Sequence, residues 1–541
     1  MNNMNMSKKI FCVLAIILVV YVYFSGLGDY GFLDPDEGRY SEIPREMIET
    51  GDYITPRLNY VKYFEKPIMH YWLTAGAFLI FGQNEFAGRF FPVTLGLLGC
   101  AVTSLLAYSI TKNKRAAFMS GMILASSTLW FGISRINLTD MTLTFFFTLA
   151  LFFFRLWVND VNRKTYLIMS YISMALGVLT KGLIAIVLPG VIAVMYALFT
   201  GQGKKILARI FSPTAIIIFF LVNFIWFIPV CRANPDFFHF FFIREHFLRY
   251  TTTIHERYQP FYFFIPILLA GSVPYTGMLC DSFMAMFGKC RMISKSDGIF
   301  LGLWFWITFI FFSFSDSKLV TYILPCFPPL AVLFGAILAS YQAHEFKRFI
   351  IINAVILIPL ALTGIIWPMF TGDSDVIAMR IPALMLSIAL LVFTAGTFIL
   401  TRRNISLIIC VLGVLCMYSA SGAFIVEGRL LSHKEGAEII SRNIKGEYDV
   451  IVFQKLMQGM NYYLERRTIT SDTIDELEFG AEQDNERDKY FITKERAAEL
   501  WNSDKRIVIT SRNRNLDYIH DIFPNPVHEW ITSADIVLVN F

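Results

Sequence analysis

The sequence predicts a polytopic α-helical membrane protein with about 13 transmembrane helices and a small C-terminal α/β domain outside the cytoplasm. Of its 541 residues, 55% are hydrophobic, including 53 phenylalanines, and only 16% are charged. An average soluble domain has about 25% charged residues. The apolar residues gather in runs long enough to cross a bilayer, and the loops between these runs alternate between basic and non-basic.

The first apolar run, residues 10–28, resembles a signal peptide because Lys8 and Lys9 precede it. It is long enough to cross a bilayer and no small-residue cleavage site follows. We therefore interpret it as an uncleaved helix that begins in the cytoplasm. The other expected spans are residues 88–110, 116–134, 138–157, 165–180, 181–199, 212–231, 261–279, 299–315, 319–341, 347–369, 381–401 and 405–424.

Every second loop between these spans is short and basic, which is typical of cytoplasmic loops. An odd number of spans puts the chain ends on opposite sides, so loops 28–87 and 232–260 and the C-terminal segment are expected outside. The basic residues are Lys112, Lys114, Arg115, Arg163, Lys164, Lys204, Lys205, Arg209, Lys289, Arg291, Lys295, Lys347, Arg348, Arg402 and Arg403.

Two short segments are special cases in this topology. Residues 180–182, Thr-Lys-Gly, have to form a tight turn between two short helices. The apolar run 68–81 is too short to span and predicts a juxtamembrane or re-entrant element.

The composition changes after about Val426, so we divide the chain into a transmembrane domain, residues 1–426, and an α/β domain, residues 427–541. No GxGxxG or Walker-type sequence indicates a nucleotide site. The eight cysteines form no CxxC pair, so no zinc or disulfide framework is indicated. Residues 449–453, 489–492, 506–510 and 536–539 predict strands, and residues 456–464 and 494–501 predict helices.

Residues 34–40, Asp-Pro-Asp-Glu-Gly-Arg-Tyr, place dense charge directly after the first span, and charge beside a membrane indicates a functional site. The apolar residues that follow recur at helical spacing and predict an amphipathic helix on the membrane surface. Pro44 favours a start near Ser41, so that the acids precede the helix. The alternative role for these acids is to complement the helix N-terminus.

Residues 63–67, Tyr-Phe-Glu-Lys-Pro, lie in the same loop. Lys66 has two interpretations. It is a lysine that extends along an apolar surface to reach water, or it is a fixed charge that binds phosphate between Glu65 and Pro67.

The second external loop contains three arginines, Arg244, Arg249 and Arg257, which suit a phosphate or pyrophosphate because guanidinium groups bind such oxygens in pairs. Ordinary salt bridges with the glutamates of the loop are the alternative. His246 and His255 lack the spacing of paired ligands on one helix, so a divalent metal has weak support and no cofactor is required.

Polar residues also lie at the outer ends of two spans. Asp140 is either an N-cap or a functional acid, since an unpaired carboxylate there is costly unless something uses it. Lys318 and Tyr322 lie one turn apart at the outer start of another span, where Pro325 and nearby prolines kink the helix. This convergence of acids and bases on one face favours an enzyme over a channel.

Six motifs resemble those of the ArnT-like aminoarabinose transferases, which belong to the wider protein O-mannosyltransferase superfamily with the GT-C fold. The resemblance covers about residues 30–340 and is weak beyond them, with small departures at Pro44 and Val320. The motifs are residues 36–43 (DEGRYSEI), 51–56 (GDYITP), 63–67 (YFEKP), 245–250 (EHFLRY), 257–260 (RYQP) and 317–325 (SKLVTYILP).

The resemblance implies a donor in which undecaprenyl phosphate carries the sugar, 4-amino-4-deoxy-L-arabinose or another amino sugar. It implies lipid A or another envelope acceptor, contact with membrane lipids, and the bacterial inner membrane with the C-terminal domain in the periplasm. Nucleic acid is not expected as a partner. By this resemblance, Asp36 and Asp140 are catalytic, and Tyr63, Lys66, Arg249 and Tyr322 bind the donor phosphate. Further candidates are Glu37, Arg39, Glu65, His246, Arg257 and Lys318.

The chemistry of the residues agrees with this assignment. A departing lipid phosphate needs positive charge, which Lys66 and Arg249 supply without a metal. Asp36 is a general base if the acceptor is a hydroxyl. If the acceptor is a lipid A phosphate, Asp36 orients the acceptor or the amine of the sugar.

Other functions remain open at this stage. The chain could be a glycosyltransferase acting on protein or another glycan, or a membrane-anchored scaffold. A polyprenyl-lipid flippase is a further alternative, although paired halves or broken helices at mid-membrane would be expected for it.

Overall fold

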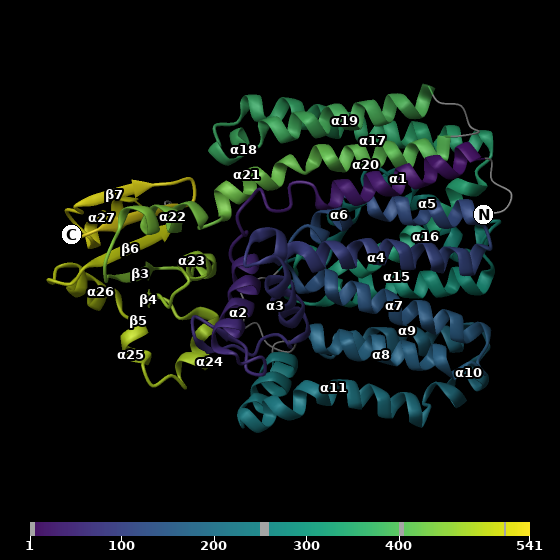
Figure 1. The fold of residues 1–541 in the computed structure, drawn as a ribbon. Helices are drawn as coiled ribbons and strands as arrows, with labels where there is room; N and C mark the ends of the chain where they lie inside the picture. Colours follow the sequence, from purple (N-terminus) through teal and green to yellow (C-terminus); the bar gives the residue numbers. More distant parts are fainter. Residues whose placement is uncertain (1–5, 249–258, 400–404, 513–515) are drawn as a thin grey trace.

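The computed structural model describes residues 6–248, 259–399, 405–512 and 516–541. Long helices form a bundle, and a smaller α/β domain covers one end of it (Figure 1). The bundle helices are α1 Met6–Phe24, α4 Glu85–Thr111, α5 Lys114–Ala125, α6 Thr128–Ser134, α7 Thr139–Asn159, α8 Lys164–Lys181, α9 Ile184–Phe199, α11 Pro213–Ala233, α13 Phe264–Gly271, α15 Lys295–Phe314, α16 Phe327–Ser340, α17 Ala343–Phe370, α19 Arg380–Ile399 and α20 Ile405–Ala420.

Each of the 13 predicted spans coincides with one of these helices or with a bent pair. Among the described residues, 8 helices are long and apolar enough to cross a membrane, or up to 10 if each bent pair is one span. The number of crossings therefore stays a prediction. Short elements connect the long ones: α10 Gly203–Ile210, η1 His239–Leu248, η2 Thr276–Met278, α14 Leu279–Met284, η3 Ala285–Lys289, η4 Val320–Cys326 and α18 Ser374–Ala378.

The predicted tight turn at residues 180–182 is present. Helix α8 ends at Lys181, and Gly182 has a φ of +84°, which glycine adopts without strain. Helix α9 then begins at Ile184. The turn between α8 and α9 lies at the end of the bundle that the α/β domain covers (Figure 1).

The first external loop is a layer between the bundle and the α/β domain. It contains α2 Asp36–Thr50, a hairpin of β1 Arg57–Leu58 and β2 Val61–Lys62, and α3 Met69–Phe81. Residues 37–47 of α2 are buried. The predicted helix on the membrane surface was therefore wrong, because its charged residues face a covering domain and each other. Arg45 pairs with Glu42 at 2.6 Å inside this layer.

The predicted start near Ser41 was also wrong, since α2 begins at Asp36 and includes Pro44. Proline has no N–H to donate to the carbonyl four residues earlier, which is that of Tyr40. The side chain of Asn137 donates to this carbonyl instead, at 3.2 Å. A contact with the bundle thus replaces the hydrogen bond that Pro44 cannot make.

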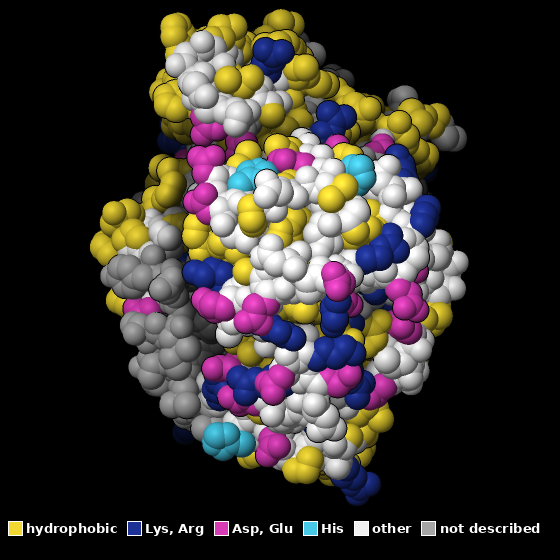
Figure 2. Space-filling view, turned by 90° about the vertical axis from the view of Figure 1, so that its left-hand side faces the viewer, with side chains coloured by type: hydrophobic (Ala, Val, Ile, Leu, Met, Phe, Trp, Pro, Cys, Tyr) yellow, Lys and Arg dark blue, Asp and Glu magenta, His cyan; other side chains and the backbone are white. Residues whose placement is uncertain are grey.

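The α/β domain has a six-stranded sheet in the order β5-β4-β3-β6-β8-β7. Neighbours from β5 to β6 are parallel, and β8 pairs antiparallel with both β6 and β7. The strands are β3 Asp449–Phe453, β4 Ile469–Ser471, β5 Phe491–Ile492, β6 Ile507–Arg512, β7 His528–Ile531 and β8 Asp535–Val539. Acidic and basic side chains are mixed over the outer face of this domain (Figure 2).

Helices α22 Lys434–Asn443 and α23 Gln458–Leu464 pack on one face of the sheet, and α26 Lys494–Trp501 and α27 Leu516–Ile522 pack on the other. Helix α21, Gly422–Leu431, leads from the bundle into the domain, and the predicted boundary at residue 427 falls within it. Short elements complete the domain: η5 Asp475–Leu477, α24 Glu478–Ala481 and α25 Arg487–Tyr490.

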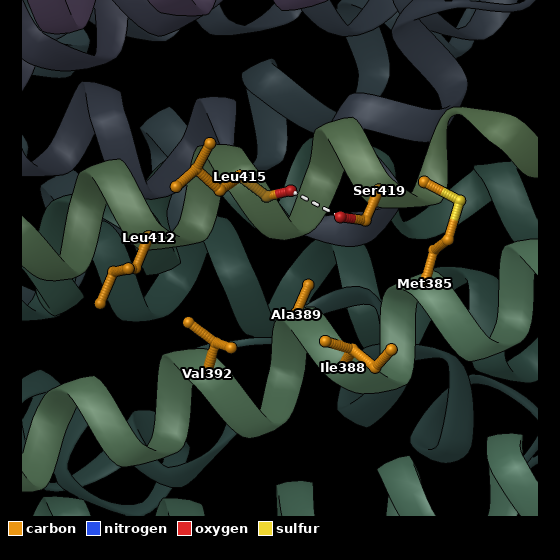
Figure 3. Close-up of a pocket in the computed structure, with 7 residues that line it drawn as sticks. All are labelled: Met385, Ile388, Ala389, Val392, Leu412, Leu415 and Ser419. Carbon is orange, nitrogen blue, oxygen red and sulfur yellow. Dashed lines mark hydrogen bonds between the residues drawn. The ribbon is translucent and has the colours of Figure 1, made fainter.

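An apolar groove runs between α19 and α20 (Figure 3). The hydroxyl of Ser419 donates to the carbonyl of Leu415 in its own helix at 3.1 Å, so it offers little polarity to the groove. None of the predicted site residues lies on these two helices. The lining residues are Met385, Ile388, Ala389, Val392, Leu412, Leu415 and Ser419.

Candidate active site

Glu37, one of the candidate acids, is a fully buried structural residue. Its carboxylate accepts two hydrogen bonds from Arg89, at 2.8 and 2.6 Å, and one each from the backbone N–H groups of Leu33 and Asn137. Arg89 also donates to three backbone carbonyls of the segment that follows α1. The pair therefore fixes the external loop to the bundle.

Asp36 has a different environment. Its side chain is 46% exposed, and Arg39 lies 3.2 Å away as its hydrogen-bonding partner. Asp36 is the first residue of α2, while Pro35 occupies the N-cap position. This carboxylate keeps an accessible face, as a group that meets a substrate must.

Arg39 links Asp36 to the α/β domain. Its guanidinium makes a two-pronged ion pair with Glu476, with Nε–Oε1 at 2.9 Å and Nη2–Oε2 at 2.8 Å. Gln458 and Tyr63 donate to the same carboxylate at 2.6 and 3.3 Å. Burial raises the pKa of Glu476 to about 7, against the opposing charge of Arg39. Tyr63, a predicted phosphate ligand, is therefore held at the domain interface.

Asp140 and Lys181 form a second pair. Asp140 is the second residue of α7, so it is not the N-cap, and its Oδ1 lies 2.7 Å from the Nζ of Lys181 at the end of α8. The same Nζ lies 4.9 Å from the ring centroid of Tyr322. The N-cap alternative for Asp140 was therefore wrong, and Lys181, the last residue of α8, is the cation beside its carboxylate.

Tyr40 connects the Asp36–Arg39 pair to the helix that carries Asp140. Its ring contacts the Arg39 guanidinium at 5.8 Å and the His70 ring at 5.4 Å. His70 in turn hydrogen-bonds at 3.1 Å to Thr142, which is two residues beyond Asp140 on α7. Burial raises the pKa of Tyr40, and the charges of Asp36 and Asp140 both add to this effect while that of Arg39 opposes it. Contacts from Arg39 through Tyr40 and His70 to Thr142 therefore join the first pair to the start of α7.

Lys66 is held close to Glu65. Its Nζ donates to the backbone carbonyl of Glu65 at 3.1 Å and lies 3.6 Å from the carboxylate of the same residue. Both side chains are 15% exposed. Lys66 is thus a charge held at the edge of the buried loop, and its role in binding phosphate stays a prediction.

The remaining candidate residues either have protein partners outside the two ion pairs or lie outside the described part of the chain. Lys318 donates hydrogen bonds to the backbone carbonyls of Gln259 and Ser315, so two donors of its ammonium are already used. Arg244 pairs at 3.0 Å with Glu478 of the α/β domain, so its partner differs from the loop glutamates that were the alternative to phosphate binding. Arg249, His255 and Arg257 lie outside the described residues. His246 falls in η1, but its side chain is outside the described part.

Lys181 and Glu476 were missed in the sequence. Lys181 carried a detectable signal, because it is a charged residue between two apolar helices at the predicted outer face. The sequence around Glu476 gave no such signal, because this residue lies in an acidic stretch that is typical of a solvated surface. Among the described side chains, no group of three or more His, Cys, Asp or Glu residues forms a potential metal site.

Two family models match this chain. Residues 6–241 match the model for dolichyl-phosphate-mannose-protein mannosyltransferase, and residues 437–524 match the model for the aminoarabinose transferase C-terminal domain. The two models thus cover parts of both the bundle and the α/β domain.

Curated relatives share one name. The chain is 33% identical over 67% of its length to "Undecaprenyl phosphate-alpha-4-amino-4-deoxy-L-arabinose arabinosyl transferase 1" of Proteus mirabilis and 30% identical over 70% of its length to the enzyme so named in Enterobacter sp.. The aligned segment spans 66% and 62% of two Proteus mirabilis relatives and 70% of the Enterobacter protein.

Solved structures resemble the whole chain. The crystal structure of ArnT from Cupriavidus metallidurans bound to undecaprenyl phosphate matches with a TM-score of 0.88 and 27% identity, over 99% of each chain. The archaeal oligosaccharyltransferase AglB from Archaeoglobus fulgidus matches with a TM-score of 0.52 at 14% identity, over 96% of this chain and 71% of that one. The second match concerns the fold alone.

Proposed function

The chain belongs to the undecaprenyl phosphate-aminoarabinose transferase family, and from this premise we propose that it transfers an amino sugar from undecaprenyl phosphate to lipid A. The single observation that carries the proposal is the presence of two ion pairs, Asp36–Arg39 and Asp140–Lys181, that are connected through Tyr40, His70 and the start of α7. Acids and bases from the first loop, the bundle and the α/β domain meet there, as a transfer reaction requires.

The leaving group explains the cations. Transfer breaks the bond between the sugar carbon and the phosphate oxygen, so negative charge develops on the lipid phosphate. Lys66 and Lys181 are positioned ammonium groups at this site, and Tyr322 lies beside Lys181. We assign these three residues to the donor phosphate, together with Arg249, which the family resemblance implies and which lies outside the described residues.

Asp36 faces the acceptor in this proposal. Its exposed carboxylate has room to accept a proton from a hydroxyl acceptor as a general base. A lipid A phosphate is already nucleophilic, and for that acceptor Asp36 orients the acceptor or binds the ammonium of the sugar. Glu37 serves the site by holding α2 in place.

The protein is a membrane protein, as its family and its apolar helices indicate. We propose the bacterial inner membrane, with the N-terminus in the cytoplasm and the α/β domain in the periplasm. The basic helix α10 lies at the end of the bundle opposite the α/β domain (Figure 1), which supports this orientation. Reporter fusions after Arg403 should be cytoplasmic and fusions after Glu447 external, whereas a cytoplasmic Glu447 fusion would overturn it.

The test uses the full-length protein in nanodiscs with a labelled undecaprenyl phosphate-sugar donor and lipid A. Transfer predicts release of undecaprenyl phosphate together with labelled lipid A, as measured by chromatography and mass spectrometry. Donor movement across the bilayer without release would indicate a flippase. Label on a protein or another glycan, with unlabelled lipid A, would overturn the proposed acceptor.

A further inference from the structure

Three buried ionisable side chains join the α/β domain to the segment before α2. His433 lies between α21 and α22, with its Nδ1 2.6 Å from Asp535 on β8 and its Nε2 3.3 Å from Asp34. All three side chains are at most 1% exposed. A carboxylate–imidazole–carboxylate chain therefore connects the last strand of the sheet to the first external loop.

Asp34 is also held by two backbone contacts from the α/β side of the molecule. Its N–H donates to the carbonyl of Leu431 at 3.2 Å, and its Oδ1 accepts from the N–H of Gly459 on α23 at 2.6 Å. A Cβ atom at Gly38 would lie 2.1 Å from this Oδ1, and one at Gly459 would lie 2.7 Å from it. Glycine at both positions is what permits the close approach.

The charge of His433 follows from its surroundings. Burial alone disfavours the imidazolium, but the carboxylates of Asp535 and Asp34 raise the pKa of His433 to about 9. A protonated imidazole carries an N–H on the nitrogen near each carboxylate and a positive charge that both attract, whereas a neutral one carries a single N–H and no charge. The next residue, Lys434, forms an ion pair with Glu85 of α4, with its Nζ 2.6 Å from Oε1.

We propose that His433 is a positioning residue that sets Asp36 in the site by fixing Asp34. Asp34 is two residues before Asp36, and α2 begins at Asp36 itself. The described side-chain partner of Asp36, Arg39, is bound to the α/β domain through Glu476. The α/β domain therefore orients the start of α2 through Asp34 and through Arg39. The position of this domain on the bundle determines the direction of the Asp36 carboxylate.

The inference rests on the proposed function, and a matched pair of variants tests it. His433→Gln retains a hydrogen-bonding side chain but has no positive charge to share between two carboxylates. Lys434→Gln breaks the neighbouring contact to Glu85, which also ties the α/β domain to the bundle, without touching Asp34. Both variants are measured as full-length protein in nanodiscs with the donor and lipid A.

We expect kcat per folded molecule to fall roughly tenfold or more in His433→Gln, because small misplacements of reacting groups are costly. The KM for the donor should stay within about twofold, since the donor phosphate is bound by other residues. Lys434→Gln should lose less than about twofold in kcat. A purely structural role would lower the yield of folded protein but leave kcat per folded molecule unchanged.

The pH profile gives a second kinetic readout. The wild-type rate should fall as the pH rises through about 9, where His433 loses its proton. His433→Gln should lack this descending limb because its side chain does not titrate. An identical limb in both proteins would overturn the inference.

Hydrogen exchange tests the inference without relying on activity. Amides of residues 34–47 should exchange roughly tenfold faster in His433→Gln and unchanged in Lys434→Gln. If wild-type protein transfers no sugar, the proposed function fails while this measurement still decides whether His433 holds the loop. Should His433→Gln not fold, Asp535→Asn gives the same comparison, and equal exchange in that variant and wild type overturns the inference.

Discussion

Asp36 and Glu37 are neighbours in one motif but differ in almost every structural property. One helical step turns them to different sides of α2. Glu37 is fully buried, and its carboxylate accepts hydrogen bonds from Arg89 and from two backbone N–H groups, while Asp36 is 46% exposed and bound to Arg39. Adjacent acids can thus have different roles, one structural and one toward a substrate. A carboxylate whose oxygens already accept hydrogen bonds from the protein has little capacity left for a substrate.

The largest effect should come from Glu37→Ala, which leaves Arg89 buried without its counter-charge. Removing one partner of a buried ion pair costs about 3–5 kcal/mol, so we expect a large loss of folded protein. Thermal unfolding in detergent, followed by tryptophan fluorescence, measures this loss. Glu49→Ala on the same helix is the control, because Glu49 is 48% exposed and Arg45 keeps Glu42 as its buried partner, so the loss should be about 0–1 kcal/mol. Equal stability of the two variants would contradict the assigned difference.

Asp36→Asn should show the opposite behaviour, with normal expression and stability but severely reduced transfer. Asparagine keeps the shape of the side chain and loses the charge and the proton affinity, and loss of general-base catalysis costs roughly 100- to 10,000-fold. Initial rates with labelled donor measure the effect. A wild-type rate in this variant would remove the acid–base role from Asp36.

Lys66→Ala should lose most transfer activity while the protein stays inserted and stable. Losing a charged contact to the departing phosphate costs about 3 kcal/mol, or roughly a hundredfold in rate. Lys66→Arg should recover only part of it, because a planar guanidinium replaces a compact ammonium. Near-normal turnover in Lys66→Ala would restore the alternative of a surface lysine.

The smallest of these effects should be that of the Asp140–Lys181 pair. We expect Asp140→Asn to be clearly impaired, by roughly tenfold or more, with normal expression. Lys181→Met should be impaired as well, and the double variant should lose less than the product of the two single losses because the residues contact each other. Independent losses would show that the two side chains act separately.

Much of the fold could be predicted from the sequence, whereas the roles of the site residues stay predictions. The helices of the bundle, four of the six strands of the α/β domain and the motifs that contain Asp36, Tyr63 and Lys66 all depend on local patterns, which a sequence shows directly. The missed strands, β4 and β7, are short and lack an apolar run.

The partners of the site residues could not be predicted in this way. Glu476 is 437 positions from Arg39, and Arg89 is 52 positions from Glu37, so only the folded chain brings each pair together. The same holds for the burial of α2. Its sequence shows one polar and one apolar side, which is equally compatible with a membrane surface and with a covering domain.

The layer formed by the first external loop has a consequence for the synthesis of this protein. The tip of its hairpin, Asn59, hydrogen-bonds to Asn461 and Thr468, just as Arg39 binds Glu476. This segment near the start of the chain therefore completes its contacts only after residues about 400 positions later have been translated. A chain that ends before Glu476 would leave Arg39 without this partner, so the order of synthesis makes the layer one of the last parts of the molecule to be finished.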